Sequence, residues 1–206
     1  MEEKSNMTAE RSLEIIRESI ERSQRTITKN SALPLIWWGS MVVVFSLLIL
    51  YLWKNHSGPV WNVLWFVMWI VGYVGNLLID KRRTPTPPSF VGKTVGHVWS
   101  SFGIIVGLMS IIICFVAFGW LPIDIIGSGH QINLTSIISL CFGMGTTTTG
   151  CIVKSPLIST CGILAGVGGF FSALQFNGPE QLYVMAAVAV VGLIIPGLVT
   201  YLKNKE

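Results

Sequence analysis

Six apolar stretches dominate this chain of 206 residues, and each is about as long as one crossing of a lipid bilayer. They cover residues 35–53, 60–79, 96–117, 134–153, the run after Pro156, and 181–202. Hydrophobic residues make up 51% of the chain and charged residues only 12%, about half the charged share of a soluble domain. The sequence therefore predicts an all-α polytopic membrane protein. We expect six transmembrane helices and a cytoplasmic N-terminal amphipathic helix.

The basic residues predict an orientation in the membrane. Thirteen of the fourteen Lys and Arg side chains fall in the N-terminal segment, between Lys81 and Lys93, at Lys154 or at the C-terminus, and only Lys54 falls on the other side. The positive-inside rule then places both termini in the cytoplasm, as in a protein of the cytoplasmic (inner) membrane. Membrane topology also accounts for the net charge of +4, so no nucleic-acid partner is expected.

Composition divides the chain into four parts. Residues 1–31 form the expected cytoplasmic amphipathic helix, and Pro34 separates it from the first crossing. Residues 32–83 form a transmembrane hairpin whose first crossing begins with Trp37 and Trp38, an aromatic pair typical of a bilayer boundary. Residues 84–93 are a Pro-rich cytoplasmic linker, and residues 94–206 are a four-helix transmembrane group. Pro196 predicts a kink in the last crossing.

Small side chains recur at helical spacing in three of the expected crossings. The third crossing carries Gly96, Ser100, Gly103, Gly107, Ser110, Cys114 and Ala117 on one face. The later crossings repeat the pattern at Gly143, Gly162, Gly166 and Gly169. Small residues let membrane helices approach closely, so we predict a helix-packing seam at these positions, with the third crossing as the packing centre.

The N-terminal segment has a narrow apolar seam at alternating steps of three and four residues. Its large members are Leu13, Ile16, Ile20 and Ile27. A helix that lies on lipid favours a broad apolar face with aromatic residues and a cationic polar face. This segment has no aromatic residue and balances its acidic and basic side chains, so it favours a partner helix, self-association or docking beneath its own bundle.

The most polar patch within an expected crossing is a run of four threonines. It comprises Thr146, Thr147, Thr148 and Thr149. Threonine hydroxyls can bond to the carbonyls of their own helix, in which case the patch is a packing seam. Alternatively, the threonines line a polar cavity together with Asn76 and His97. Both interpretations stay open at this point.

Residue patterns typical of catalysis are lacking in the sequence. All ten acidic residues lie outside the apolar cores, which argues against an ion-coupled pump that uses a buried charge. The four cysteines lie in apolar segments without a Cys-x-x-Cys pair or a neighbouring histidine, so we expect free buried thiols. We predict a protein that is not an enzyme and has no catalytic residue, cofactor or metal site.

Two short segments carry a resemblance to a known family. Ser12-Leu13-Glu14-Ile15-Ile16 and the membrane entry Leu35-Ile36-Trp37-Trp38-Gly39 resemble those of small six-helix bacterial membrane proteins of uncharacterised function. That resemblance implies a regulatory or stress-linked role in the membrane. The six crossings and cytoplasmic termini are also similar to the vitamin-binding S-components of energy-coupling-factor transporters. Those proteins carry an Ala-x-x-x-Ala motif in the first helix, whereas this chain has no alanine between Leu33 and Trp53.

Two functional hypotheses follow. The first is a regulatory or interaction protein, embedded in the membrane, that contacts a protein partner through its N-terminal helix. The second is a small-molecule transport component with a cavity lined by threonine and glycine.

Overall fold

The computed structural model describes residues 9–56, 58–81, 90–117, 120 and 133–203, and nearly all of them are helical, which confirms the expected all-α fold. The elements are α1 (Ala9–Asn55), η1 (Gly58–Val63), α2 (Leu64–Lys81), α3 (Phe90–Ala117), α4 (Leu134–Ile152), α5 (Pro156–Ile163), η2 (Leu164–Gly168), α6 (Gly169–Leu174), η3 (Gly178–Glu180), α7 (Gln181–Ala189), η4 (Val190–Ile194) and α8 (Ile195–Lys203). Residues 90–93 of the expected linker belong to α3. The rest of that linker and the first eight residues lie outside the described part.

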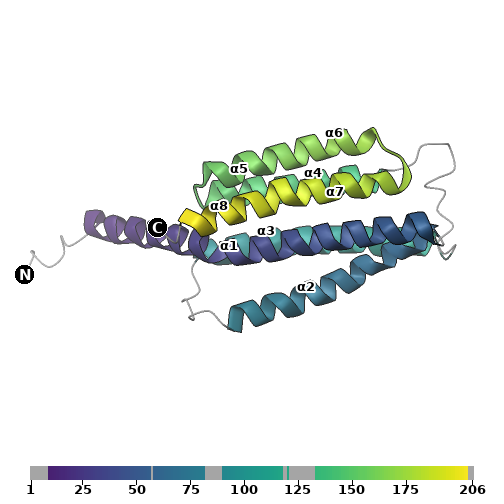
Figure 1. The fold of residues 1–206 in the computed structure, drawn as a ribbon. Helices are drawn as coiled ribbons and strands as arrows, with labels where there is room; N and C mark the ends of the chain where they lie inside the picture. The colour runs from purple at the N-terminus through teal and green to yellow at the C-terminus, as the bar shows by residue number, and fades with distance from the viewer. Residues whose placement is uncertain (1–8, 57, 82–89, 118–119, 121–132, 204–206) are drawn as a thin grey trace, which may run out of the picture.

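The helices lie side by side in an elongated bundle, and α1 extends beyond it at one end (Figure 1). α2, α4 and α8 end where α3 and α5 begin, so Lys81, Lys154 and Lys203 share one end of the bundle. We call this the basic end. Lys54, in the last turn of α1, lies at the opposite end.

Five stretches of the described residues are long and apolar enough to cross a membrane. They are Asn30–Asn55, Gly58–Lys81, Phe90–Phe115, Pro156–Leu174 and Gly178–Lys203. The expected sixth crossing, α4, has 19 residues but is not among them. α4 contains five threonines and packs against α3, α5, α6 and α7. Other helices therefore cover a helix whose own composition is less apolar.

α1 continues through Pro34 as one helix of 47 residues. The N-terminal helix and the first crossing, which we expected Pro34 to separate, are therefore parts of the same helix. A proline in a helix interior removes one amide donor and favours a kink or an end. Here Ala32 and Leu35, on either side of it, are buried. A Cβ atom on Gly197 of α8 would lie 3.2 Å from the backbone oxygen of Ala32, which shows how closely the two helices approach. This packing holds α1 together across the proline.

Trp37 and Trp38, the aromatic pair at the start of the first expected crossing, lie between α1 and α2. The Trp37 indole donates a hydrogen bond of 3.0 Å to the carbonyl oxygen of Gly72. A Cβ atom on Gly72 would lie 2.5 Å from the Trp38 ring, and one on Gly75 would collide with Trp37. The two glycines thus make room for two indole rings, which attach α2 to α1.

The expected close approach of helices occurs between α4 and the helix pair that follows it. A Cβ atom on Gly143 would collide with the Cα atom of Gly166, and one on Gly162 would lie 2.6 Å from the amide nitrogen of Thr147. A Cβ atom on Gly169 would meet Val188 and Ser139. At Gly143, Gly162 and Gly166 the neighbouring atoms include backbone, so α4 and the segment α5–η2 are close enough for dispersion between their backbones to hold them together.

α3 is not the packing centre that its small residues predicted. A Cβ atom on Gly107 or Gly96 would meet nothing within 4 Å, and one on Gly103 would meet only the Trp69 ring, at 3.1 Å. α3 contacts the bundle through Trp99 and Phe102, which make edge-to-face contacts with Phe142 of α4 at centroid distances of 5.9 and 6.0 Å. The three glycines of the stripe on α3 therefore meet no other helix backbone within the described chain.

Two π-helical turns interrupt the last two helical segments of the bundle. η2 lies between α5 and α6, and η4 lies between α7 and α8, next to Pro196. In η4 the Ile195 amide donates to the Val190 carbonyl oxygen, a step of five residues. The distortion expected from Pro196 thus takes the form of a π-turn, a common cause of irregularity in long helices.

Candidate functional site

The N-terminal part of α1 projects beyond the bundle (Figure 1). It carries a row of large apolar side chains. Leu13, Ile16 and Ile20 are 65%, 55% and 41% exposed. Their spacing of three and four residues places them on one face of the helix. We call these three residues the α1 seam. An exposed apolar row outside a membrane span is unusual unless another surface covers it.

The fourth residue expected in this seam, Ile27, lies where α1 meets the basic end of the bundle. Ile27 is half-buried. Close to it, the Gln24 side chain donates a hydrogen bond of 3.0 Å to the carbonyl oxygen of Ile152, at the end of α4. The expected four-residue seam is therefore divided between an exposed part and a part at the bundle, and only the exposed part offers a free surface.

Charges around the α1 seam are balanced. Arg17 Nε lies 3.2 Å from Glu21 Oε1, and both side chains are exposed. A surface pair of this kind contributes little to stability, typically about 0–1 kcal/mol. Because acidic and basic side chains alternate here, the segment offers little net attraction to an anionic membrane surface.

The four threonines point to different sides of α4. Thr146 and Thr149 are buried, and their hydroxyls donate to the carbonyl oxygens of Phe142 and Gly145 at 3.0 and 2.8 Å. Thr147 lies against Gly162, and Thr148 is exposed. Two of the four hydroxyls thus satisfy carbonyls of their own helix, as the packing interpretation requires.

Asn76 and His97 do not join the threonines. Asn76 lies on α2 and donates to the Asp80 carboxylate at 3.1 Å, whereas His97 lies exposed on α3. Neither of them lines the groove that contains Thr147 and Thr148, which has a volume of about 280 Å³ and is otherwise lined by glycine and apolar side chains. The six residues expected around a polar cavity are therefore not brought together.

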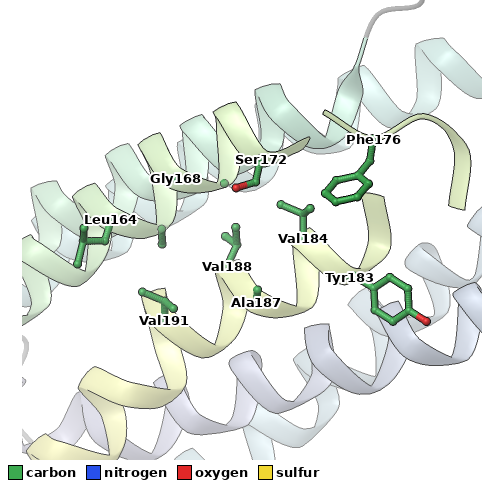
Figure 2. A pocket seen from close by; sticks show the side chains of 11 residues that line it. Leu164, Gly168, Ser172, Phe176, Tyr183, Val184, Ala187, Val188 and Val191 are labelled. Carbon is green, nitrogen blue, oxygen red and sulfur yellow. The ribbon is translucent and has the colours of Figure 1, made fainter. Parts of the chain in front are cut away.

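A larger groove of about 350 Å³ lies between α5–η2–α6 and α7–η4, and Figure 2 shows its lining. Most of its side chains are apolar. Lys54 and Glu180 form an ion pair of 3.1 Å at the end of the bundle opposite the basic end, and the Lys54 Nζ atom lies 5.6 Å from the centre of the Tyr183 ring, another groove residue.

Within the described residues, no group of three His, Cys, Asp or Glu side chains is placed to hold a metal ion. The four cysteines are free thiols, of which Cys161 is buried, Cys114 and Cys141 are half-buried, and Cys151 is exposed.

Several residues that shape the fold are not apparent from sequence patterns. They are Gly39, Gly72, Gly75, Gly192 and Gly197, each close enough to a neighbouring element that a Cβ atom would crowd it. The spacing of Gly72 and Gly75 along one face was the available signal for two of them. The Lys54–Glu180 pair had no local signal, because its members lie far apart in the sequence.

Comparison with protein-family models, with curated proteins and with solved structures finds no match to this chain. The function is therefore argued from the geometry of the chain itself.

Proposed function

We propose that this chain is a non-enzymatic protein of the bacterial cytoplasmic membrane that binds a protein partner through the α1 seam. It crosses the membrane six times and keeps both termini in the cytoplasm. The partner is a helix from another protein or from a second copy of this chain. Binding at the seam then regulates or recruits that partner at the membrane.

The membrane placement is supported by five apolar stretches of sufficient length. α4 supplies the sixth crossing, because its polar hydroxyls bond to its own carbonyls and other helices cover it. The basic end of the bundle carries Lys81, Lys154 and Lys203 and is cytoplasmic by the positive-inside rule.

The observation that carries the proposal is the continuity of α1. A helix of 47 residues is about 70 Å long, more than twice the roughly 30 Å of hydrocarbon that one crossing needs. One part of it carries the exposed α1 seam, and the other contributes Ile49 and Leu50 to the bundle core. A partner bound at the seam is thus attached to the membrane bundle through a single unbroken helix.

The chemistry of the seam favours a helix as its partner. Three aliphatic side chains at intervals of three and four residues form a ridge that fits an apolar groove or a second such ridge. Lipid binding would need a wider apolar face with interfacial aromatic residues. The described part of the segment has a narrow seam and exposed charges of both signs, such as Arg17 and Glu21.

The test is photo-crosslinking in cells from a photoreactive amino acid in place of Leu13. We expect a discrete crosslinked protein product, which is lost when Ile16→Glu and Ile20→Glu are combined, because two buried carboxylates would prevent helix packing.

Ile15 provides the matched control. It is 60% exposed on the same helix but lies off the seam. The Ile15→Glu variant should keep the crosslinked product. Equal loss in Ile15→Glu and in the double variant would contradict a contact specific to the seam, and crosslinking to lipid in place of protein would overturn the proposal.

A further inference from the structure

The α1 seam lies on the side of α1 that faces the bundle. With 3.6 residues per turn, its three residues lie within about 80° of Gln24 around the helix axis, and the Gln24 side chain donates to the Ile152 carbonyl oxygen at the end of α4. Further along the same face, Leu35 and Trp38 pack into the core cluster that contains Phe142 of α4. The seam therefore faces the space directly beyond the basic end of the bundle.

This direction argues against a second copy of the chain as the partner. In the proposed membrane placement two copies have the same orientation, so their α1 helices run parallel. A second α1 helix packed along the seam would lie about 8–10 Å from the first. Continued towards the membrane, it would enter the space where Leu35 and Trp38 meet the core cluster. The seam thus suits a helix that crosses α1 beyond the bundle.

The length of the α1 seam matches the width of one such helix. Along the helix axis, Ile20 lies about 6 Å and Leu13 about 17 Å beyond Gln24. A helix with its side chains is about 10–12 Å wide. A helix that crosses α1 at this level therefore covers all three seam residues and also lies against the basic end of the bundle.

Lys154 lies at the edge of this space. It is exposed and follows Ile152, the acceptor of the Gln24 hydrogen bond, by two residues. Its φ of 53° is the only positive value of a non-glycine residue in the described chain. Glycine adopts this conformation at lower cost and is the common residue after a helix end. Lysine thus places a positive charge at this turn at a cost to the backbone, and the described residues give it no ion-pair partner.

We propose that the partner at the α1 seam is an amphipathic helix of another protein, with an aliphatic ridge on the seam and a carboxylate that pairs with Lys154. The charges of α1 itself are balanced, as in the pair of Arg17 and Glu21, so the basic end of the bundle decides the preferred sign of the partner. This inference rests on the proposed function and adds to it the chemistry of the partner.

The test is peptide binding to the full chain in phosphatidylcholine nanodiscs, measured by fluorescence anisotropy with empty nanodiscs as the blank. Two helical peptides share one ridge of leucines at steps of three and four residues, and the positions beside the ridge carry glutamate in one and lysine in the other. We expect the glutamate peptide to bind more tightly. The difference should shrink at high salt, because salt screens exposed charges.

Variants of Lys154 test the charge contact. Lys154→Gln should weaken binding of the glutamate peptide by about two- to fivefold, the effect of an exposed ion pair. Lys154→Glu should reverse the preference between the two peptides, a result that a misfolded chain could not give. Lys54→Gln is the matched control, because it removes the same charge at the opposite end of the bundle and should leave binding unchanged.

The seam variant separates this inference from the proposed function. Ile16→Glu combined with Ile20→Glu should abolish binding of both peptides. If it does, but the wild type binds both peptides equally or Lys154→Glu keeps the wild-type preference, the acidic partner is refuted and the seam contact stands. Wild-type binding by the double variant would contradict the proposed function itself. A dimer of the chain in nanodiscs that the double variant loses would show that a second copy occupies the seam, and would overturn this inference.

Discussion

At the scale of single residues, Gly143 and Gly166 bring two helix backbones into direct contact. A Cβ atom on Gly166 would lie 2.8 Å from the Cα atom of Gly143, and one on Gly143 would lie 2.8 Å from the carbonyl oxygen of Gly162. Backbone atoms inside a helix cannot move aside as the end of a flexible side chain can. Gly72 and Gly75 differ in this respect, because their neighbours are the indole rings of Trp38 and Trp37.

Gly143→Ala should therefore destabilise the bundle. The added methyl group collides with backbone, and overpacking of this kind costs typically about 1–3 kcal/mol. Gly107→Ala adds the same methyl group in open space and should change stability little. Thermal unfolding of the two variants in one detergent measures the difference. Equal midpoints would show that α4 and η2 do not touch as described.

At the scale of helices, the sequence predicted the helical elements well but not which helix face meets another. α3 and α4 both carry small residues at helical spacing, yet Gly143 and Gly150 of α4 meet a neighbouring backbone and Gly107 of α3 does not. The physical reason is that lipid tails are as apolar as the surface of a membrane helix. In a membrane, hydrophobicity therefore does not distinguish the helix face that packs against another helix from the face that contacts lipid. Spacing identifies a possible contact face and leaves its partner undetermined.

Pro34 is a second case in which tertiary packing prevails over local preference. Residue preferences alone end a helix near this proline. Burial of Ala32 and Leu35 and the close approach of Gly197 keep α1 continuous instead. The exposed residues of the α1 seam were predictable from spacing, whereas the position of Ile27 depends on a contact between Gln24 and the distant Ile152, which no local pattern encodes.

Gly197→Leu should loosen α1 around Pro34. A Cβ atom there would already lie 2.9 Å from Ile36 Cγ1, so a larger side chain must push α1 away from α8. We expect faster amide hydrogen exchange at residues 30–36, by about tenfold if local opening becomes easier by 1.4 kcal/mol, while exchange within α4 stays unchanged. Unaltered exchange at residues 30–36 would show that α8 does not support this part of α1.

At the scale of the whole molecule, charge and length agree on one arrangement. Lys81, Lys154 and Lys203 lie at the end of the bundle from which α1 projects, and Lys54 lies at the other end in a pair with Glu180. If the bundle spans the membrane, the α1 seam lies in the cytoplasm, where a soluble or membrane-bound partner can reach it.

Labelling of single cysteines by a membrane-impermeant maleimide tests this arrangement most directly, in a background with all four native cysteines replaced. Intact cells should label a cysteine at His56 or Asn177, which are exposed at the end opposite the basic end. A cysteine at Arg17 or Lys154 should react only after the membrane is permeabilised. Labelling at Arg17 in intact cells would place the α1 seam outside the cytoplasm and contradict the account.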